Sequence, residues 1–345
     1  MVLVDNKKKK AAFNIAIFPI LLVVIYLVFH EDYRAILECI GSVSVPALLF
    51  LLGMGVGYQL LDSAACFTLI HARFPALKYR QAVEITFLGI FGNVFAFSVG
   101  IIPMQSYYLY REGMNVGSGI GTIILKYIFH KISIFCYVTV MFFAQRKWIK
   151  KTIPELSKYI YLGFAICAVI ILVLILLCTW EKVQQLLLQL IVKLPDTGKW
   201  EHRKTVWCKN LKAFYSESRE VVKNQVCCLK VAVWNVLKLV WLYSIPFAAM
   251  KILHISGLTF GKAQALTAVM FLIAGVLPHV AGIGPTEFAF LMLFTGYIGR
   301  VSASSTLVLY RVATYFFPFL LSIGVFLKVK RSMLNKTENK LQEES

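Results

Sequence analysis

The sequence predicts an all-α polytopic membrane protein with about six full transmembrane helices and two re-entrant helical hairpins, arranged as an inverted repeat. Three observations predict this fold class. Of the 345 residues, 59% are hydrophobic and only 15% are charged, against roughly 25% charged residues in an ordinary globular domain. Long apolar runs recur along the chain, and the mean hydropathy is +0.73. Two glycine-containing segments in the two halves carry similar six-residue words.

The apolar runs are long enough to cross about 30 Å of hydrocarbon as helices. They cover residues 13–29, 45–70, 118–143, 158–180, 226–250 and 303–327. A β-barrel would show shorter segments of alternating hydrophobicity. The first run follows four lysines, Lys7 to Lys10, but exceeds the apolar part of a signal peptide and precedes no small-residue cleavage site. We therefore expect it to be a retained helix.

The net charge of +19 arises from 36 Lys and Arg residues against 17 Asp and Glu residues. Most basic residues lie between the apolar runs or at the chain ends, which suits contact with anionic lipids of the inner leaflet. No soluble segment is large enough for a nucleic-acid-binding domain, so nucleic acid is excluded as a partner. The eight cysteines show no C-x-x-C spacing and the six histidines no H-E-x-x-H motif. We expect neither a metal site nor a cofactor.

Basic loops orient the chain by the positive-inside tendency. The lysines before the first run place the N-terminus in the cytoplasm, and residues 71–80 return there after an acidic external loop. The segment 181–225 holds nine Lys and Arg residues against five acids, so it is expected to be a cytoplasmic amphipathic basic segment. The tail 331–345 is also expected in the cytoplasm. The protein is expected in the cell membrane, with both termini on the cytoplasmic side.

Counting crossings requires two segments to return to the side from which they started. The segment 82–102 is interrupted by glycines and is predicted to be a hairpin of two half-helices, which leaves the basic loop 145–151 outside. The segment 263–299 is predicted to be a second hairpin that enters from the opposite face. The chain then forms a single membrane domain with halves 11–143 and 158–330, an inverted repeat typical of secondary transporters.

The two hairpins share the pattern G-I-x-P-x-[QE]. It reads GIIPMQ from Gly100 through Pro103 to Gln105, and GIGPTE from Gly282 to Glu287. A chance match in a glycine-rich membrane chain is the alternative explanation.

Gly284 and Pro285 predict the start of a half-helix, because glycine permits a sharp turn and proline at the first helical position needs no N–H. Glu287 then falls at the third position, in the positive field of the helix terminus. It is either a helix-start carboxylate that satisfies free N–H groups, or part of a site where two half-helix starts hold a phosphate. In the second case it would contact a cationic group, a hydroxyl or a proton.

Several other charged residues within apolar runs are candidates for the same cavity, because intramembrane charges face protein or water. Lys238 is expected in the cavity, and Asp62 either there or only near a helix end. The cluster of Lys126, His130 and Lys131 is either part of the site or a snorkelling pair at the interface. Partners considered for Glu287 are Arg311, Lys126, Lys131 and Lys238.

The two G-I-x-P-x-[QE] motifs, together with the helix that follows the second motif, resemble the lysylphosphatidylglycerol synthase transmembrane region. This region is the flippase domain of the multiple-peptide-resistance-factor family. The resemblance covers nearly the whole chain. The family pattern P-x-P-G-G-x-G-x-x-E, followed by a helix with R-x-x-x-Y, corresponds here to Pro278, Gly282, Gly284, Glu287, Arg311 and Tyr315. The first region departs from the family, because Gly100-Ile101-Ile102 replaces a Gly-Gly pair.

The resemblance implies that the protein is a flippase-like transporter that moves an anionic or aminoacylated phospholipid, such as a lysylphosphatidylglycerol-like lipid, between leaflets. Full-length members add a soluble aminoacyltransferase domain, which we expect to be absent from this chain. The alternative is a membrane subunit of a phosphatidylglycerol lysyltransferase or another lipid-modifying enzyme. Expected partners are a phospholipid substrate, inner-leaflet lipids, a second copy in a homodimer and a separate lipid-modifying enzyme.

We expect no catalytic residue in this chain. The expected substrate-binding residues are Gly100, Pro103, Gln105, Arg111, Lys126, Lys238, Gly282, Gly284, Pro285, Glu287, Arg311 and Tyr315.

Overall fold

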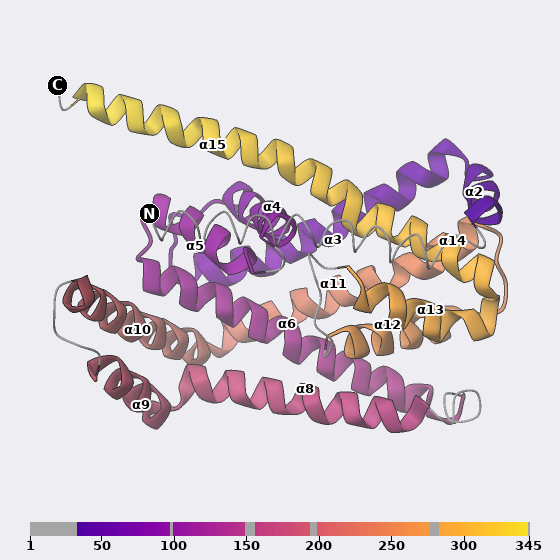
Figure 1. The fold of residues 1–345 in the computed structure, drawn as a ribbon, viewed down its shortest axis with the longest axis horizontal. Coiled ribbons are helices and arrows are strands. Elements are labelled where there is room, and N and C mark those ends of the chain that lie inside the picture. Colours follow the sequence, from indigo (N-terminus) through magenta and orange to yellow (C-terminus); the bar gives the residue numbers. More distant parts are fainter. Residues whose placement is uncertain (1–32, 97–98, 149–155, 194–198, 276–282, 344–345) are drawn as a thin grey trace.

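The computed structural model describes residues 33–96, 99–148, 156–193, 199–275 and 283–343, and these residues form helices joined by short turns (Figure 1). The helices are α2 (Tyr33–Gly41), α3 (Val45–His71), α4 (Tyr79–Phe95), α5 (Ile101–Arg111), α6 (Val116–Ala144), α8 (Leu156–Thr179), α9 (Glu181–Val192), α10 (Lys199–Lys223), α11 (Gln225–Ile252), α12 (Phe260–Ala274), α13 (Pro285–Ile298), α14 (Arg300–Arg311), the π-helix η1 (Val312–Phe316) and α15 (Phe317–Glu343).

Within the described part of the chain, four helices are long and apolar enough to cross a membrane. They are α3, α6, α11 and the continuous stretch Arg300–Ser332 of α14, η1 and α15. These spans agree closely with four of the six apolar runs. The run 158–180 corresponds to α8, which contains the shorter apolar segment Tyr161–Val173. The run 13–29 lies outside the described residues. The all-helical membrane fold is therefore confirmed, while the count of six spans stays a prediction.

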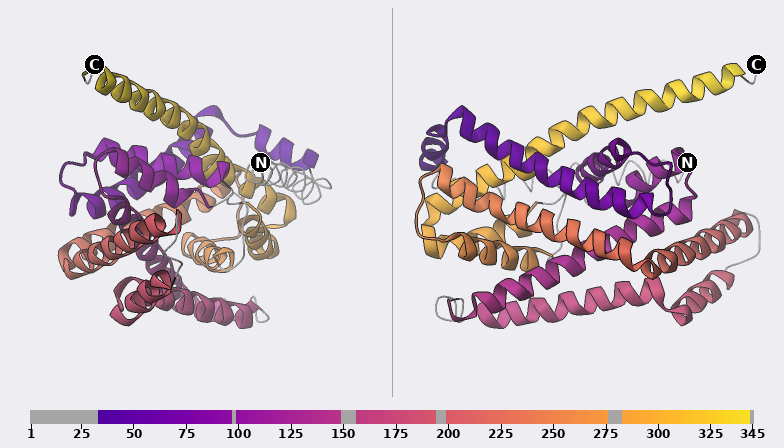
Figure 2. Two further views of the ribbon diagram at one scale, coloured as in Figure 1. Left: turned by 60° about the vertical axis from the view of Figure 1, so that its left-hand side comes forward. Right: turned by 180° about the vertical axis from the view of Figure 1, so that it is seen from behind.

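Helices α3 and α11 form the most extensive helix pair and lie side by side in both Figure 1 and the rear view of Figure 2. Their contact depends on glycine. At Gly57 an added Cβ atom would lie 3.0 Å from the indole of Trp241, whose Nε1 donates a hydrogen bond to the Met54 carbonyl at 2.7 Å. Close backbone approach through small residues is the usual packing of helices within membranes.

Another glycine brings α3 against the π-helix. An ideal Cβ at Gly55 would lie 1.8 Å from the Ala313 carbonyl oxygen, far inside van der Waals contact. Only a residue without a side chain fits there. This crossing fixes α3 beside the segment that follows Arg311.

The segment of the first predicted hairpin, 82–102, overlaps two packed helices, α4 and α5, but the break between them is displaced, and the re-entrant course stays a prediction. Helix α4 runs without interruption through Gly89 and Gly92, and the second arm does not begin until Ile101. The prediction of a break at these glycines was wrong. They are spacers instead, because a Cβ at Gly89 would lie 2.3 Å from Gln105 Nε2 and one at Gly92 would lie 2.5 Å from the Gly100 carbonyl.

The second predicted hairpin appears as α12 and α13, which pack against each other. The outer ends of each pair meet. Gln81 Nε2 near the start of α4 donates to Glu112 at the end of α5 at 2.7 Å. A Cβ on Gly257, just before α12, would lie 3.2 Å from the Tyr297 carbonyl near the end of α13. In each pair, the chain therefore enters and leaves at the same place, where the first helix starts and the second one ends.

The segment predicted as cytoplasmic and amphipathic, 181–225, forms α9 and α10. Helix α10 packs along the first half of α6, where Gly117 faces Asn210 and Gly121 faces Phe214 (Figure 1). Helix α10 carries many charges but is anchored to the bundle by this glycine contact. Whether the segment also touches a lipid surface stays a prediction.

Contacts at the ends of the long helices group the loops as the sequence predicts. Arg73, after α3, pairs with Glu217 of α10 at 3.0 Å, so two segments predicted to be cytoplasmic meet. Two segments predicted to be external also meet, because the ring of Trp148 lies 4.9 Å from that of Tyr297 and Lys262 Nζ lies 5.1 Å above Trp148. The relative placement of these loops is thus consistent with the counted crossings.

We predict that Gly55→Ala destabilises the protein, because the new methyl group must displace the Ala313 carbonyl. Overpacking of this kind costs about 1–3 kcal/mol. Thermal unfolding of the purified protein measures it. Gly53→Ala is the matched control, since an added Cβ there meets nothing within 4 Å. Equal melting temperatures for the two variants would contradict the assigned α3–η1 contact.

Candidate functional site

Glu287 lies at the start of α13, where the sequence places it. Pro285 is the first helical residue, and Gly284 precedes it with a φ of 109°, a backbone conformation that favours glycine. One carboxylate oxygen of Glu287, Oε2, accepts a hydrogen bond from the Gly284 N–H at 2.7 Å. The predicted half-helix start is therefore confirmed as a local structure.

The second carboxylate oxygen of Glu287 binds Arg311. The distance from Glu287 Oε1 to Arg311 Nη2 is 2.5 Å, and the side chains are 18% and 11% exposed. Arg311 is thus the partner among the four cations considered from the sequence. Its guanidinium also lies over the ring of Tyr315, with Cζ 5.5 Å from the ring centroid. This group is called the Glu287 cluster.

A π-helical turn places Tyr315 relative to Arg311. Residues 312–316 form η1, directly after the α-helical residue Arg311. Single π-turns are rare within helices and occur frequently at functional sites, because the wider turn redirects side chains. The same turn contains Ala313, which meets Gly55 of α3.

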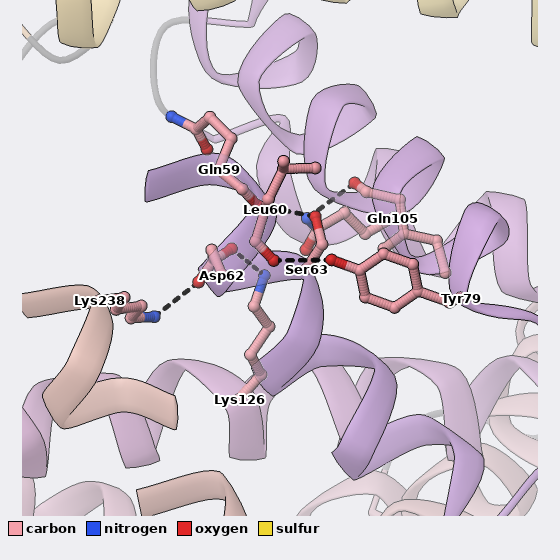
Figure 3. A network of polar contacts seen from close by, with 9 residues as sticks. Gln59, Leu60, Asp62, Ser63, Tyr79, Gln105, Lys126 and Lys238 are labelled. Atoms are coloured by element: carbon pink, nitrogen blue, oxygen red, sulfur yellow. Dashed lines mark hydrogen bonds and ion pairs between the residues drawn. The ribbon is translucent and has the colours of Figure 1, made fainter. Parts of the chain in front are cut away.

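A second charged group lies between three of the spanning helices, and Figure 3 shows its geometry. Asp62 on α3 accepts hydrogen bonds from Lys126 of α6 at 2.6 Å and from Lys238 of α11 at 2.5 Å. The side chains are 14%, 12% and 1% exposed, respectively. With one carboxylate and two ammonium groups, this Asp62 cluster has a formal charge of +1.

Both clusters lie at depth within the spans. Asp62 is 17 residues after the start of α3 and nine before its end. Gly55, which meets η1 two residues beyond Arg311, precedes Asp62 by seven residues, or about 10 Å of helical rise. The two clusters are therefore neighbours along one face of the bundle. Charged groups at such depth cost about 2.5–3.5 kcal/mol each on insertion scales and commonly mark pathways for substrates or ions.

His130 adds a polar atom next to the Asp62 cluster. It lies one turn after Lys126 on α6, and its Nδ1 is buried without a hydrogen-bond partner in the described structure. Buried polar atoms are normally satisfied, so an unpaired one beside two ammonium groups calls for a partner such as a water molecule or a ligand atom.

The residues expected at the start of the first hairpin are arranged differently from their counterparts in the second. Helix α5 begins at Ile101, so Pro103 is its third residue and not its first. Gln105 lies deeper in the helix, where it is 3% exposed and its Nε2 donates to the Ile85 carbonyl at 3.0 Å. The expectation that Pro103 and Gln105 match Pro285 and Glu287 was wrong. The reason is that Gly100 and the two isoleucines already begin the helix.

Of the other residues expected at the site, one lies at the far end of α5 and one lies outside the described residues. Arg111 is the exposed last residue of α5, at the opposite end of that helix from Gly100. Gly282 and Pro278 lie outside the described residues. The structure thus brings together Glu287, Arg311 and Tyr315 in one group and Lys126 and Lys238 in another.

Asp62 was absent from the expected site residues although sequence reasoning had noted it. A signal was present, because Asp62 is the only acidic residue in the apolar run 45–70 and Lys126 and Lys238 are cations within two other runs. The sequence alone could not show that these three runs meet at that level.

Comparison with known families is consistent with this architecture. The chain belongs to the family described as the lysylphosphatidylglycerol synthase TM region, which it matches over residues 12–322. No curated protein matches the chain. With its spanning helices, this membership makes the chain a multi-pass membrane protein of a lipid-related family.

We predict that Asp62→Asn destabilises the protein strongly and Lys238→Met only weakly. The first variant leaves two buried ammonium groups without a counter-charge, which costs about 3–5 kcal/mol, whereas the second leaves a neutral pair of Asp62 and Lys126. Thermal unfolding in detergent measures both. Glu220→Gln serves as the control, because that carboxylate is 46% exposed in surface ion pairs. If Lys238→Met proved as damaging as Asp62→Asn, the charge balance assigned here would be incorrect.

Proposed function

We propose that this protein translocates an anionic or aminoacylated phospholipid between the leaflets of the cell membrane. The observation that carries the proposal is the Asp62 cluster, a buried group within the spanning helices whose two ammonium groups share the one carboxylate that the described residues provide. A phosphate diester would neutralise it. Membership in a lipid-related family supports a lipid as the source of that phosphate.

The cluster has free donors for a phosphate. An ammonium group carries three N–H donors, and each lysine uses one of them on Asp62. Two donors on Lys126 and two on Lys238 remain for phosphate oxygens, and the unpaired Nδ1 of His130 is close by. Asp62 therefore holds both ammonium groups in place, and the headgroup completes the charge balance.

The Glu287 cluster supplies the second half of the proposed site. Its carboxylate is held by Gly284 and Arg311, so a small shift of Arg311 toward a phosphate would release Glu287 for an ammonium group. An aminoacylated headgroup carries both charges. We infer that such a lipid engages the two clusters together, with its acyl chains outside the bundle.

The proposed transport requires a membrane arrangement finer than a set of spanning helices. We propose that α4 with α5 and α12 with α13 are re-entrant hairpins that enter from opposite faces and belong to an inverted repeat. Helix α5 has 11 residues and α13 has 14, too few to cross about 30 Å of hydrocarbon. Their outer ends meet at opposite ends of the bundle, which supports this arrangement. The end with Arg73 and α10 is assigned to the cytoplasm by its basic residues.

We predict that Glu287→Gln and Arg311→Ala each lower translocation at least about tenfold, as expected for a lost hydrogen bond to a charged group. The translocation rate is measured in proteoliposomes that contain fluorescent phosphatidylglycerol, lysylphosphatidylglycerol or phosphatidylcholine. A quencher added outside removes the fluorescence of lipid in the outer leaflet. Glu220→Gln is the control variant, and thermal unfolding verifies that each variant is folded. Wild-type rates in both site variants would rule out this role for the cluster.

A second candidate function follows from the family description, which names a synthase. In that case the chain would be the membrane subunit of a lipid-modifying enzyme that works with a separate catalytic domain. Lipid extraction from a deletion strain separates the two. Loss of a transporter leaves the modified lipid present but confined to the inner leaflet, whereas loss of an enzyme subunit removes it.

A further inference from the structure

Lys131 lies on a different face of α6 from Lys126 and does not join the Asp62 cluster. It lines a pocket on the side of the bundle between α6, α8 and α12. The pocket, here called the lateral pocket, is lined by Lys131 with Tyr127, Phe135, Cys167, Ile170 and Phe271. In Figure 1, α8 forms the edge of the bundle beside α6.

The ammonium of Lys131 is near the middle of a spanning helix and lacks a counter-charge there. It lies 15 residues after the start of α6 and 13 before its end. Its ammonium group makes a cation–π contact with the ring of Tyr127, and the distance from Lys131 Nζ to the ring centroid is 5.3 Å. Across the described ranges, no carboxylate lies within 4 Å of it. A cation at such depth is costly unless an anion joins it.

The pocket is built to leave space beside this ammonium. Gly275 ends α12, and a Cβ there would lie 3.4 Å from Lys131 Nζ. The carboxyl-terminal end of a helix carries partial negative charge, so the end of α12 attracts a nearby cation without neutralising it. The pocket also reaches the surface of the bundle, because Tyr127, which lines it, is 45% exposed.

We propose that the lateral pocket binds one anionic phospholipid, with its phosphate on Lys131 and part of an acyl chain on the apolar wall of α8. Charge complementarity identifies this occupant, because the pocket combines a cation that has no carboxylate partner among the described residues with apolar side chains near the middle of a spanning helix. A role of this pocket in the path of a translocated headgroup rests on the proposed function. Binding of a phospholipid in the pocket does not depend on that function.

The test is native mass spectrometry of the purified full chain with dioleoylphosphatidylglycerol, and with dioleoylphosphatidylcholine as a neutral comparison. Lys131→Met is expected to lower the affinity for one phosphatidylglycerol at least about tenfold, as for a lost charge-assisted hydrogen bond. Lys131→Arg keeps the charge and should retain binding. Lys251→Met is the matched control, since Lys251 also lies over a ring, that of Phe247, but near the end of α11.

Cys167→Phe provides a second variant that keeps Lys131 and fills the pocket beside it. It should weaken phosphatidylglycerol binding as well, which distinguishes a whole lipid from a bare phosphate on the lysine. The proposal is overturned if Lys131→Met binds phosphatidylglycerol like the wild type, or if Lys251→Met loses as much. Because no translocation is measured, failure here leaves the proposed function standing, and loss of that function leaves this site standing.

Discussion

Pairing of one carboxylate with two ammonium groups at depth is the constraint on which the bundle depends. Asp62 on α3 forms ion pairs with Lys126 of α6 and Lys238 of α11. These helices are distant in sequence, so the ion pairs require all three to meet at one level. Each of the three charges would be costly alone in hydrocarbon. The pairing therefore sets the relative positions of three spans along their axes. It leaves one formal positive charge that no further carboxylate in the described part of the chain neutralises.

Glycine contacts then set how close the second charged group lies to the first. Gly55 admits the Ala313 carbonyl, and this crossing places η1, and with it Arg311 and Tyr315, about two turns of α3 from Asp62. Helix association in membranes lacks a hydrophobic driving force, so such close backbone packing supplies much of the specificity. The distance between the two clusters is a consequence of where α3 lacks a side chain.

The sequence could predict features that depend on local chemistry. Spanning helices follow from apolar length, and the helix start at Pro285 follows from glycine, proline and a carboxylate in order. The break of the first hairpin could not be predicted, because Gly89 and Gly92 are compatible with either a break or a close contact, and only the position of Gln105 decides. The Asp62 cluster could not be predicted either, because its members come from three separate apolar runs and the sequence does not show at which level these runs meet.

The two hairpins, alike in their sequence words, are chemically unequal. In the second, Glu287 and Arg311 place a balanced ion pair at the helix start. In the first, the corresponding Gln105 is buried and its amide binds the Ile85 carbonyl, so it ties α5 to α4. An amide that already donates to backbone has less to offer a headgroup than a carboxylate shared between an N–H and a guanidinium. Gln105 of the first hairpin therefore has a structural role, and the proposed contact with a headgroup is assigned to Glu287 of the second.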